Sequence, residues 1–390
     1  MSALAIFTTT TFGQGRLVTL SRFTTPTLIE HALSGFGMGP PTAVTPLPPH
    51  GLALFRPNLV AMAGARYLFW TAAVASSIDD IYEVIAVFDR RTRSIGVIPG
   101  QRFTSGTVQL VADPLRPRIF VHKWAVFGGS AGLIGVVDET LTYRSVLVAG
   151  WIGTAFAYAP QANRLFVTRY HPFQDPLLEV VVLDGDTAQE VGAFPVPAED
   201  NLRENQLTVT ADGQRVFYYK QVFFDQDQVS QIHLFDGMGV PLATSARVDL
   251  AGYNRFVVDE IRGILLVPER IPVTAFSSTR RLIALDAATL APLGAANGGA
   301  YGLVQTFQPL YGKGPVGAYV AWTPEGDTTP VPCRPFIDVF DTAGGLASRL
   351  DIAQQSGFIP STFVVCTAIT AVLSAPAAPS THAANVQANH

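Results

Sequence analysis

The sequence predicts an all-β protein with the architecture of a β-propeller, and three observations carry this prediction. An apolar strand that ends on an aspartate recurs along the chain at a near-constant spacing. A second pattern, formed by a strand, a polar turn and an apolar strand, precedes several of these segments. Helical periodicity is sustained only around PTLIEHALSGF, residues 26–36, which we interpret as the single candidate helix.

The aspartate-ended strands define the repeat. In VIAVFDRRTRSIGVI the apolar run stops at an aspartate, and a polar turn leads into a second strand. The gaps between successive aspartates are 49, 46, 52, 50 and 55 residues, which is the spacing of propeller blades of four strands. Each carboxylate is placed to accept backbone N–H groups in the bend. The six aspartates are Asp89, Asp138, Asp184, Asp236, Asp286 and Asp341.

The second pattern supplies the first half of each blade. Its β-branched and aromatic residues predict strands, and the Gly, Pro, Asp and Asn residues between them predict a tight turn. The four clearest copies are VADPLRPRIFV (111–121), YAPQANRLFV (158–167), VTADGQRVFYY (209–219) and VVDEIRGILLV (257–267).

The two ends of the chain complete the ring. Residues 358–376 have the pattern of the inner half of a blade, and residues 3–20 have the pattern of an outer hairpin. Joining them closes the ring as a seven-bladed β-propeller and removes the open sheet edges. Six blades is the alternative if the N-terminal hairpin does not pair in this way. We therefore predict one propeller domain, residues 1–376, followed by an Ala- and Pro-rich tail, residues 377–390.

The repeat resembles the YVTN or lactonase-like group of β-propeller proteins, in which a hairpin ending in an aspartate recurs from blade to blade. The resemblance covers nearly the whole chain and implies the fold, whereas propellers carry many unrelated activities. In its size, its apolar composition and its expected lack of a signal peptide, the chain is also similar to fungal intracellular propeller proteins that act as hetero-Diels–Alderases in tropolone sesquiterpenoid pathways.

Composition narrows the range of partners. The 390 residues are 48% hydrophobic and 14% charged, with a net charge of -4 and no long basic run, so nucleic acid is not expected as a partner. No apolar run reaches the roughly 18 residues of a membrane span, and the N-terminus lacks the features of a signal peptide. We expect a cytoplasmic protein. Cys333 and Cys366 are too few for a disulfide framework, and whether they pair stays open.

Three motifs imitate known sites. Asp79-Asp80 would suit a metal motif on a helix, but the pair falls between two predicted strands, so we interpret it as a hairpin bend. Gly128-Gly129-Ser130-Ala131-Gly132 matches the Gly-x-Ser-x-Gly elbow of hydrolases, which requires a strand followed by a helix; here two strands flank it. Asp184 and Asp186 lack the other ligands of a calcium loop. The seven histidines show no metal-binding spacing, and we expect no metal and no cofactor.

The innermost strand of each blade precedes the polar turn, and its polar residues alternate with apolar ones. Because the apolar set must pack between blades, the polar set is expected to line the central channel. This set comprises Thr107, Gln109, Gln206, Thr208, Tyr253, Arg255 and Gln305, with Trp151, Tyr301 and Phe103 as aromatic residues near the channel mouth.

These residues suggest a site for an apolar or aromatic organic molecule. We expect Arg255, Tyr253 and Gln305 to be the catalytic donors of a small-molecule enzyme, with the remaining residues of the set binding the substrate. The resemblance suggests a cyclisation or hetero-Diels–Alder reaction. The alternatives are a lactonase-like hydrolase and a non-catalytic scaffold that binds another protein, in which case Arg255 pairs with Glu204 or with carbonyl groups of the next blade.

Overall fold

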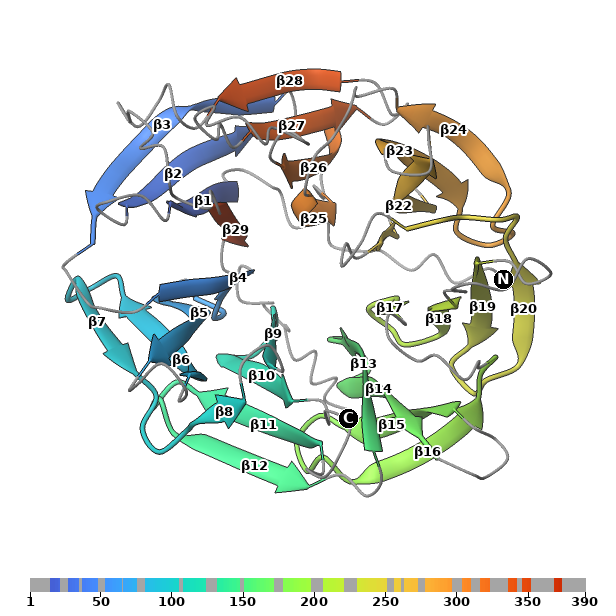
Figure 1. Ribbon diagram of the computed structural model, residues 1–390, viewed down its shortest axis with the longest axis horizontal. Coiled ribbons are helices and arrows are strands. Elements are labelled where there is room, and N and C mark those ends of the chain that lie inside the picture. The colour runs from blue at the N-terminus through green and yellow to red at the C-terminus, as the bar shows by residue number, and fades with distance from the viewer. Residues whose placement is uncertain are drawn as a thin grey trace, which may run out of the picture.

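A computed structural model describes residues 15–21, 27–34, 37–47, 53–64, 66–75, 81–104, 108–123, 132–147, 151–171, 178–197, 206–220, 230–250, 256–260, 263–272, 278–296, 304–309, 316–322, 336–341, 346–351 and 368–373. These residues form antiparallel sheets that stand around a ring, as a β-propeller requires (Figure 1). No helix in the described part of the chain has the length and apolar character needed to cross a membrane.

Three sheets begin the ring. The sheet that joins the two ends of the chain contains β29 (Ala368–Leu373), β1 (Gly15–Ser21), β2 (Thr27–Ser34) and β3 (Gly37–Pro46). The next contains β4 (Ala53–Ala61), β5 (Tyr67–Ala75), β6 (Ile81–Asp89) and β7 (Ser94–Val97), and β8 (Phe103–Thr104) pairs with β6. The third contains β9 (Val108–Ala112), β10 (Arg118–Lys123), β11 (Leu133–Asp138) and β12 (Tyr143–Leu147).

Four further sheets follow the same order. The fourth sheet contains β13 (Trp151–Ala159), β14 (Arg164–Tyr170), β15 (Leu178–Asp184) and β16 (Glu190–Pro195), and the fifth contains β17 (Gln206–Val209), β18 (Arg215–Lys220), β19 (Gln231–Asp236) and β20 (Pro241–Thr244). The sixth contains β21 (Val257–Asp259), β22 (Ile264–Pro272), β23 (Ser278–Asp286) and β24 (Pro292–Ala296). The last contains β25 (Val304–Pro309), β26 (Val316–Trp322), β27 (Phe336–Asp341) and β28 (Leu346–Asp351).

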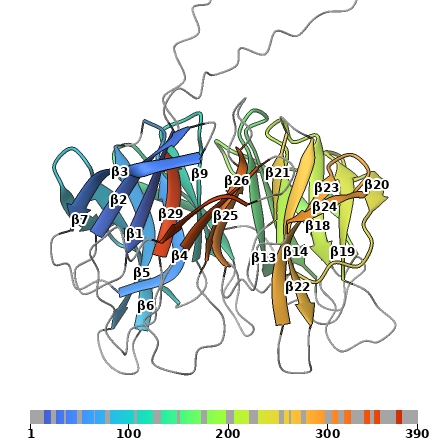
Figure 2. The ribbon, with the colours of Figure 1, turned by 90° about the horizontal axis from the view of Figure 1, so that it is seen from above.

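The ring closes between the ends of the chain, as the sequence predicts. The C-terminal strand β29 is the innermost strand of its sheet and pairs antiparallel with β1, from Arg16 opposite Leu373 to Ser21 opposite Ala368. The inner strands β29, β4 and β25 are neighbours in Figure 2. The N-terminal segment contributes three strands, β1, β2 and β3, where the sequence suggested a hairpin within residues 3–20.

The candidate helix at residues 26–36 was a wrong prediction. Residues Thr27–Ser34 form strand β2, which pairs with β1 on one side and with β3 on the other. The backbone groups of this segment are bonded in two ladders at once, so tertiary context overrides the weak helical periodicity of an eight-residue segment. Leu28 turns into the core between this sheet and the next.

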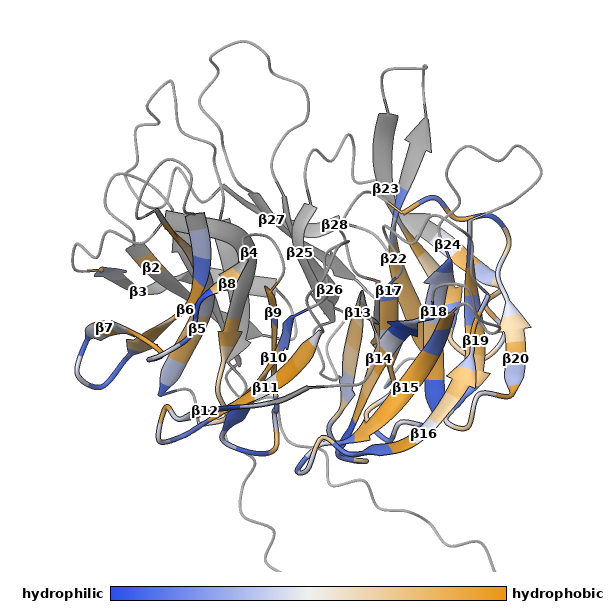
Figure 3. Ribbon diagram, turned by 60° about the horizontal axis from the view of Figure 1, so that its bottom comes forward, coloured by the Kyte–Doolittle hydropathy of each residue, from blue (hydrophilic) through white to orange (hydrophobic). Residues whose placement is uncertain are grey.

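The core lies between neighbouring sheets, and each strand contributes to two of these layers. On β18, Val216 and Tyr218 pack toward the β13–β16 sheet, whereas Phe217 and Tyr219 pack toward the β21–β24 sheet. All four side chains are fully buried. Burying each large apolar side chain contributes on the order of 1.5–3 kcal/mol. In Figure 3 the middle strands β11 and β15 are coloured as hydrophobic along most of their length.

The expected role of the aspartates in the bends is confirmed wherever their side chains are described. In each of the five turns one carboxylate oxygen accepts backbone N–H groups from residues two to four positions further on, as Asp184 does from Asp186 and Thr187 at 3.0 Å. A residue with positive φ completes each turn. These residues are Arg93, Leu141, Ala188, Gly239 and Leu290.

The two faces of the ring differ in the length of their connections. One face carries the links from the first to the second strand and from the third to the fourth, such as residues 90–93, 113–117 and 210–214. We call it the aspartate-turn face. At the opposite face, which we call the long-loop face, the second strand of a sheet ends before the third begins, and several of these connections are long, such as the nine residues between Lys123 and Leu133. Because variable loops on a rigid scaffold commonly carry binding sites, the long-loop face is where a site is expected.

Candidate functional site

Four of the predicted channel residues lie at the same end of their inner strands. Each inner strand runs from the long-loop face to the aspartate-turn face because it is the first strand of its sheet. Trp151 and Gln206 are the first residues of β13 and β17, while Gln109 and Gln305 are the second residues of β9 and β25. The fold therefore brings these four positions to the long-loop end. Thr107, Tyr253, Arg255 and Tyr301 lie outside the described residues, directly before β9, β21 and β25 in the sequence.

The expected alternation is present on the inner strands β9 and β17, whereas residues 155–159 of the inner strand β13 are all buried. Leu207 and Val209 are buried on β17, whereas Gln206 and Thr208 are half-buried. On β9, Val108 and Leu110 are buried and Gln109 is half-buried. Partial exposure on the innermost strand, which borders the centre of the ring in Figure 1, is what a channel-lining position requires. The side chains of Trp151 and Gln305 are outside the described set.

Phe103 does not fit its predicted place at the channel mouth. It is only 3% exposed and lies on β8, whose partner is the third strand of its sheet, far from the inner strand in chain order. Its ring packs against Tyr143, with the ring centroids 6.2 Å apart, inside the core between two sheets. An apolar ring on a strand next to the rim gains more from this burial than from exposure at the mouth.

Of the three motifs that imitate known sites, the structure describes the Asp184 and Asp186 pair, whereas Asp79-Asp80 and the glycine-rich motif at 128–132 are not fully described. Asp184 caps its own turn and forms an ion pair with Arg164, and Asp186 forms an ion pair with Arg118, so the pair acts within turns and between sheets. Residues 76–80 and 124–131 lie outside the described residues. The strands that flank each of these segments, β5 with β6 and β10 with β11, are paired antiparallel, as in a hairpin. Among the described residues no group of His, Cys, Asp or Glu has metal-binding geometry.

A cluster that sequence reasoning missed lies on the long-loop face of the β13–β16 sheet. His171 follows the last residue of β14, and its Nε2 atom is 2.7 Å from Oε1 of Glu179 on β15. The guanidinium of Arg169 donates to the same oxygen at 2.6 Å and reaches Glu190 on β16. Burial opposes charge on Glu179, but the hydrogen bonds from His171 and Arg169 outweigh it and lower the pKa of this carboxyl group.

This cluster adjoins a predicted site residue. In the ladder between β13 and β14, Trp151 is directly opposite Tyr170, the residue before His171. In the next ladder Tyr170 is opposite Leu178, the residue before Glu179. At the same end of the sheet, His171 is thus one strand and Glu179 two strands further out than Trp151. An imidazole oriented by a carboxylate is the arrangement of a general base.

A second network, on the aspartate-turn face, ties two sheets together. The Arg118 guanidinium donates to Asp113 at 2.9 Å within its own sheet and to Asp186 at 2.7 Å in the next. The Tyr158 hydroxyl donates to Asp113 at 2.7 Å and accepts from Arg118. Asp113 is fully buried and Arg118 is only 12% exposed. Since every polar group named here already has a hydrogen-bond partner, we interpret the network as a structural connection between two blades.

This network predicts a specific response to high pH. Burial, followed by the hydrogen bond to Asp113, raises the pKa of Tyr158 from 10.0 to about 12. A raised pKa stabilises the fold fully below pH 10.0, and this contribution disappears as the pH rises through about 12. We expect the wild type to lose about 2 kcal/mol more stability over this interval than Tyr158→Phe does. Urea unfolding across the interval measures the difference; equal losses in both proteins would contradict the assignment.

Comparison with solved structures agrees with the fold. A protein from Bacteroides uniformis provisionally described as a 6-phosphogluconolactonase has a TM-score of 0.53 and 12% identity, over 91% of this chain and 99% of its own. One of the same description from Bacteroides fragilis has a TM-score of 0.51 and 13% identity, over 88% and 95%. TolB from Acinetobacter baumannii has a TM-score of 0.43 and 14% identity, over 93% of this chain and 66% of its own.

At this level of identity the likeness shows the fold alone, and together with the ring of antiparallel sheets it defines a β-propeller. The sequence matches no protein-family model and no curated protein. The two Bacteroides structures give the expectation of a hetero-Diels–Alderase no support.

Proposed function

We propose that the protein is a lactonase-like hydrolase, which opens a cyclic ester at the long-loop end of the propeller channel. The observation that carries this proposal is the His171–Glu179 pair beside the backbone position of Trp151. The channel residues predicted from the sequence include no histidine and no carboxylate, which a hydrolase needs near its substrate. The pair supplies both, on the face where the inner strands begin with half-buried polar residues.

The geometry suggests how water would be activated. With the proton on Nε2, His171 donates it in a hydrogen bond to Glu179, and its Nδ1 atom is left as a proton acceptor. Nδ1 then removes a proton from a water molecule as the water oxygen attacks the lactone carbonyl carbon. The bond from that carbon to the ring oxygen breaks, the ring oxygen takes the proton, and a hydroxy acid leaves. Glu179 stabilises the imidazolium that forms between these steps.

The residues predicted from the sequence take the complementary role. We assign Arg255, Tyr253 and Gln305 as donors to the negative charge that develops on the carbonyl oxygen. Trp151 and Tyr301 would form aromatic walls, and Gln109, Gln206 and Thr208 would bind polar groups of the substrate, with Thr107 completing the set. A lactone with an apolar or aromatic body fits this combination. We also infer a seven-bladed ring, since the sheet that contains β29 and β1 is complete with four strands.

The two Bacteroides proteins lend the proposal support by their description as 6-phosphogluconolactonases, and they cover nearly the whole length of this chain. The alternative of a cyclase without hydrolytic activity has no comparable support. The alternative of a protein-binding propeller expects Arg255 to pair with Glu204 or with carbonyl groups of the next blade, and both residues lie outside the described residues.

A direct test is the hydrolysis of lactones followed by acid release in a pH-stat. The panel contains a sugar δ-lactone, a phosphorylated sugar lactone and an aryl lactone. We expect at least one saturable rate about a hundredfold above the buffer rate, and a loss of about a hundredfold in kcat/KM in Arg255→Ala. Rates at the buffer level for every lactone, with a folded wild-type protein, would refute the proposal.

A further inference from the structure

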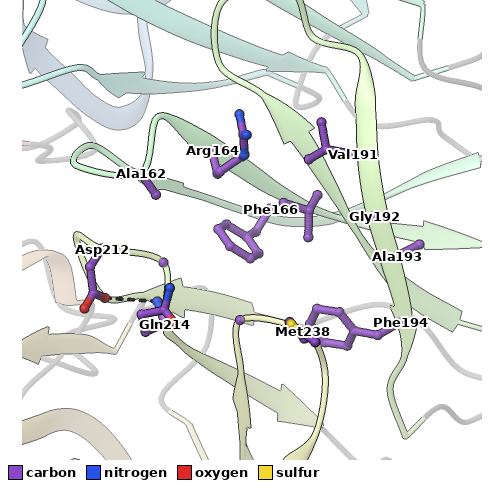
Figure 4. A pocket seen from close by; sticks show the side chains of 13 residues that line it. Ala162, Arg164, Phe166, Val191, Gly192, Ala193, Phe194, Asp212, Gln214 and Met238 are labelled. Atoms are coloured by element: carbon purple, nitrogen blue, oxygen red, sulfur yellow. Dashed lines mark hydrogen bonds between the residues drawn. The ribbon is translucent and has the colours of Figure 1, made fainter.

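A groove of about 580 Å³ lies between the β13–β16 and β17–β20 sheets, at their aspartate-turn ends, and extends to the outer strand β16. In Figure 4 the Phe166 ring points into the middle of the groove, with Phe194 and Met238 at one side and Arg164 at the other. The outer strand β16 and the turn between β19 and β20 form its two lips. The residues that line it are Ala162, Arg164, Phe166, Val182, Val191, Gly192, Ala193, Phe194, Asp212, Gly213, Gln214, Gly237 and Met238.

The lips of this groove carry exposed apolar side chains. Met238 is 84% exposed and Val191 is 51% exposed, and Val240 and Leu242 extend the exposed apolar surface along the edge of the β17–β20 sheet. A small-molecule site normally encloses most of its ligand. Here the exposed apolar side chains lie on open lips, so a segment of another protein that rests on these lips fits better.

The charges on one side of the groove specify the partner further. In two sheets, an arginine at the start of the second strand pairs with the turn aspartate: Arg66 with Asp89 and Arg164 with Asp184. In the β17–β20 sheet, Arg215 donates instead to the carbonyl group of Ala287. Within the described residues Asp236, which directly precedes Gly237, makes no ion pair, and neither does Asp212.

We propose that this groove docks an extended segment of a partner protein that carries an apolar side chain near a lysine or arginine. The apolar side chain would rest between Val191 and Met238, the exposed side chains of the two lips. The cation would lie toward Asp212 and Asp236, where it would supply the positive charge that the arginine provides in other blades. This surface is separate from the proposed lactone site and carries its own test.

The chain offers matched variants for the apolar half of the proposal. A Cβ atom at Gly192 would meet no atom within 4 Å, so Gly192→Trp can be introduced without a clash at Cβ and places an indole at the groove. Gly294 on β24 has equally open surroundings and does not line the groove, so Gly294→Trp is the control.

A second pair of variants tests the charge. Asp236→Asn keeps the oxygen that accepts the N–H groups of Met238 and Val240 and removes the negative charge. Asp286→Asn makes the same change in the next sheet, where the aspartate caps an equivalent turn away from the groove.

The experiment selects random phage-displayed peptides on the wild-type protein and measures the synthetic peptides by fluorescence anisotropy. We expect the selected peptides to contain an apolar and a basic residue, and we expect Gly192→Trp to weaken their affinity for the protein about tenfold or more. Asp236→Asn should weaken the affinity for these peptides about two- to fivefold and reduce the dependence of this affinity on salt. The controls Gly294→Trp and Asp286→Asn should bind the peptides as the wild type does.

Three results would overturn the proposal. The selection could give no peptide with saturable binding, or the selected peptides could bind Gly192→Trp as tightly as the wild type. Light scattering could also detect a concentration-dependent dimer that Gly192→Trp abolishes, which would assign the groove to a second copy of this chain.

Discussion

Replacing Arg118 by methionine is expected to destabilise the protein by about 3 kcal/mol, because it leaves the fully buried carboxylate of Asp113 without its main counter-charge. The same change removes the bond from Arg118 to Asp186 across the sheet boundary. Arg116 and Tyr158 remain near Asp113, which keeps the expected loss at the lower end of the range for a broken buried pair. The free energy of unfolding in urea measures it.

Arg144→Met is the matched control. Arg144 also forms an ion pair with an aspartate, Asp138, at 2.9 Å, but its side chain is 77% exposed. Exposed pairs contribute little, so a loss of less than about 1 kcal/mol is expected. If both variants lost the same small amount, the interblade network would contribute no more than a surface ion pair.

The largest expected effect on activity comes from His171→Asn, which should lower kcat for the best lactone by about a hundredfold or more. Asparagine preserves polarity but cannot take up the proton of the attacking water. Glu179→Gln should have a smaller effect, about tenfold, because it removes the charge that orients and stabilises the imidazole. Initial rates over a range of lactone concentrations separate kcat from KM.

His233→Asn provides the comparison for this prediction. His233 lies on β19 and contacts Thr244 on β20, away from the long-loop face cluster, so its replacement should leave kcat within about twofold of wild type. Equal losses from His171→Asn and His233→Asn would indicate a general effect on folding. Unchanged activity in His171→Asn would remove His171 from the proposed mechanism.

Much of the fold could be predicted because each repeat carries its own local signals. The aspartate at the end of the third strand caps a short turn, and this chemistry depends only on residues two to four positions apart. The ring closure was predictable because the two ends carry complementary parts of one blade. The interpretation of residues 26–36 failed because pairing with two strands, one on either side, decides the conformation of β2.

The site was predictable only in part. The alternation on β17 follows from a period of two, so Gln206 and Thr208 could be placed by pattern alone. The approach of His171 to Glu179 depends on the register between β14 and β15, across a connection whose length sets no recognisable motif spacing. The groove forms between two repeats, and no sequence window contains both of its lips.

One measurement tests most directly the claim that substrate binds at the long-loop end of the inner strands. It compares kcat/KM for the best lactone in wild type, Gln206→Trp and Leu115→Trp. Gln206 begins β17 at the long-loop face, whereas Leu115 is an exposed residue of a turn on the aspartate-turn face. With unfolding midpoints unchanged, we expect a loss of about a hundredfold in Gln206→Trp and wild-type activity in Leu115→Trp. Full activity in Gln206→Trp, or a loss confined to Leu115→Trp, would contradict the account.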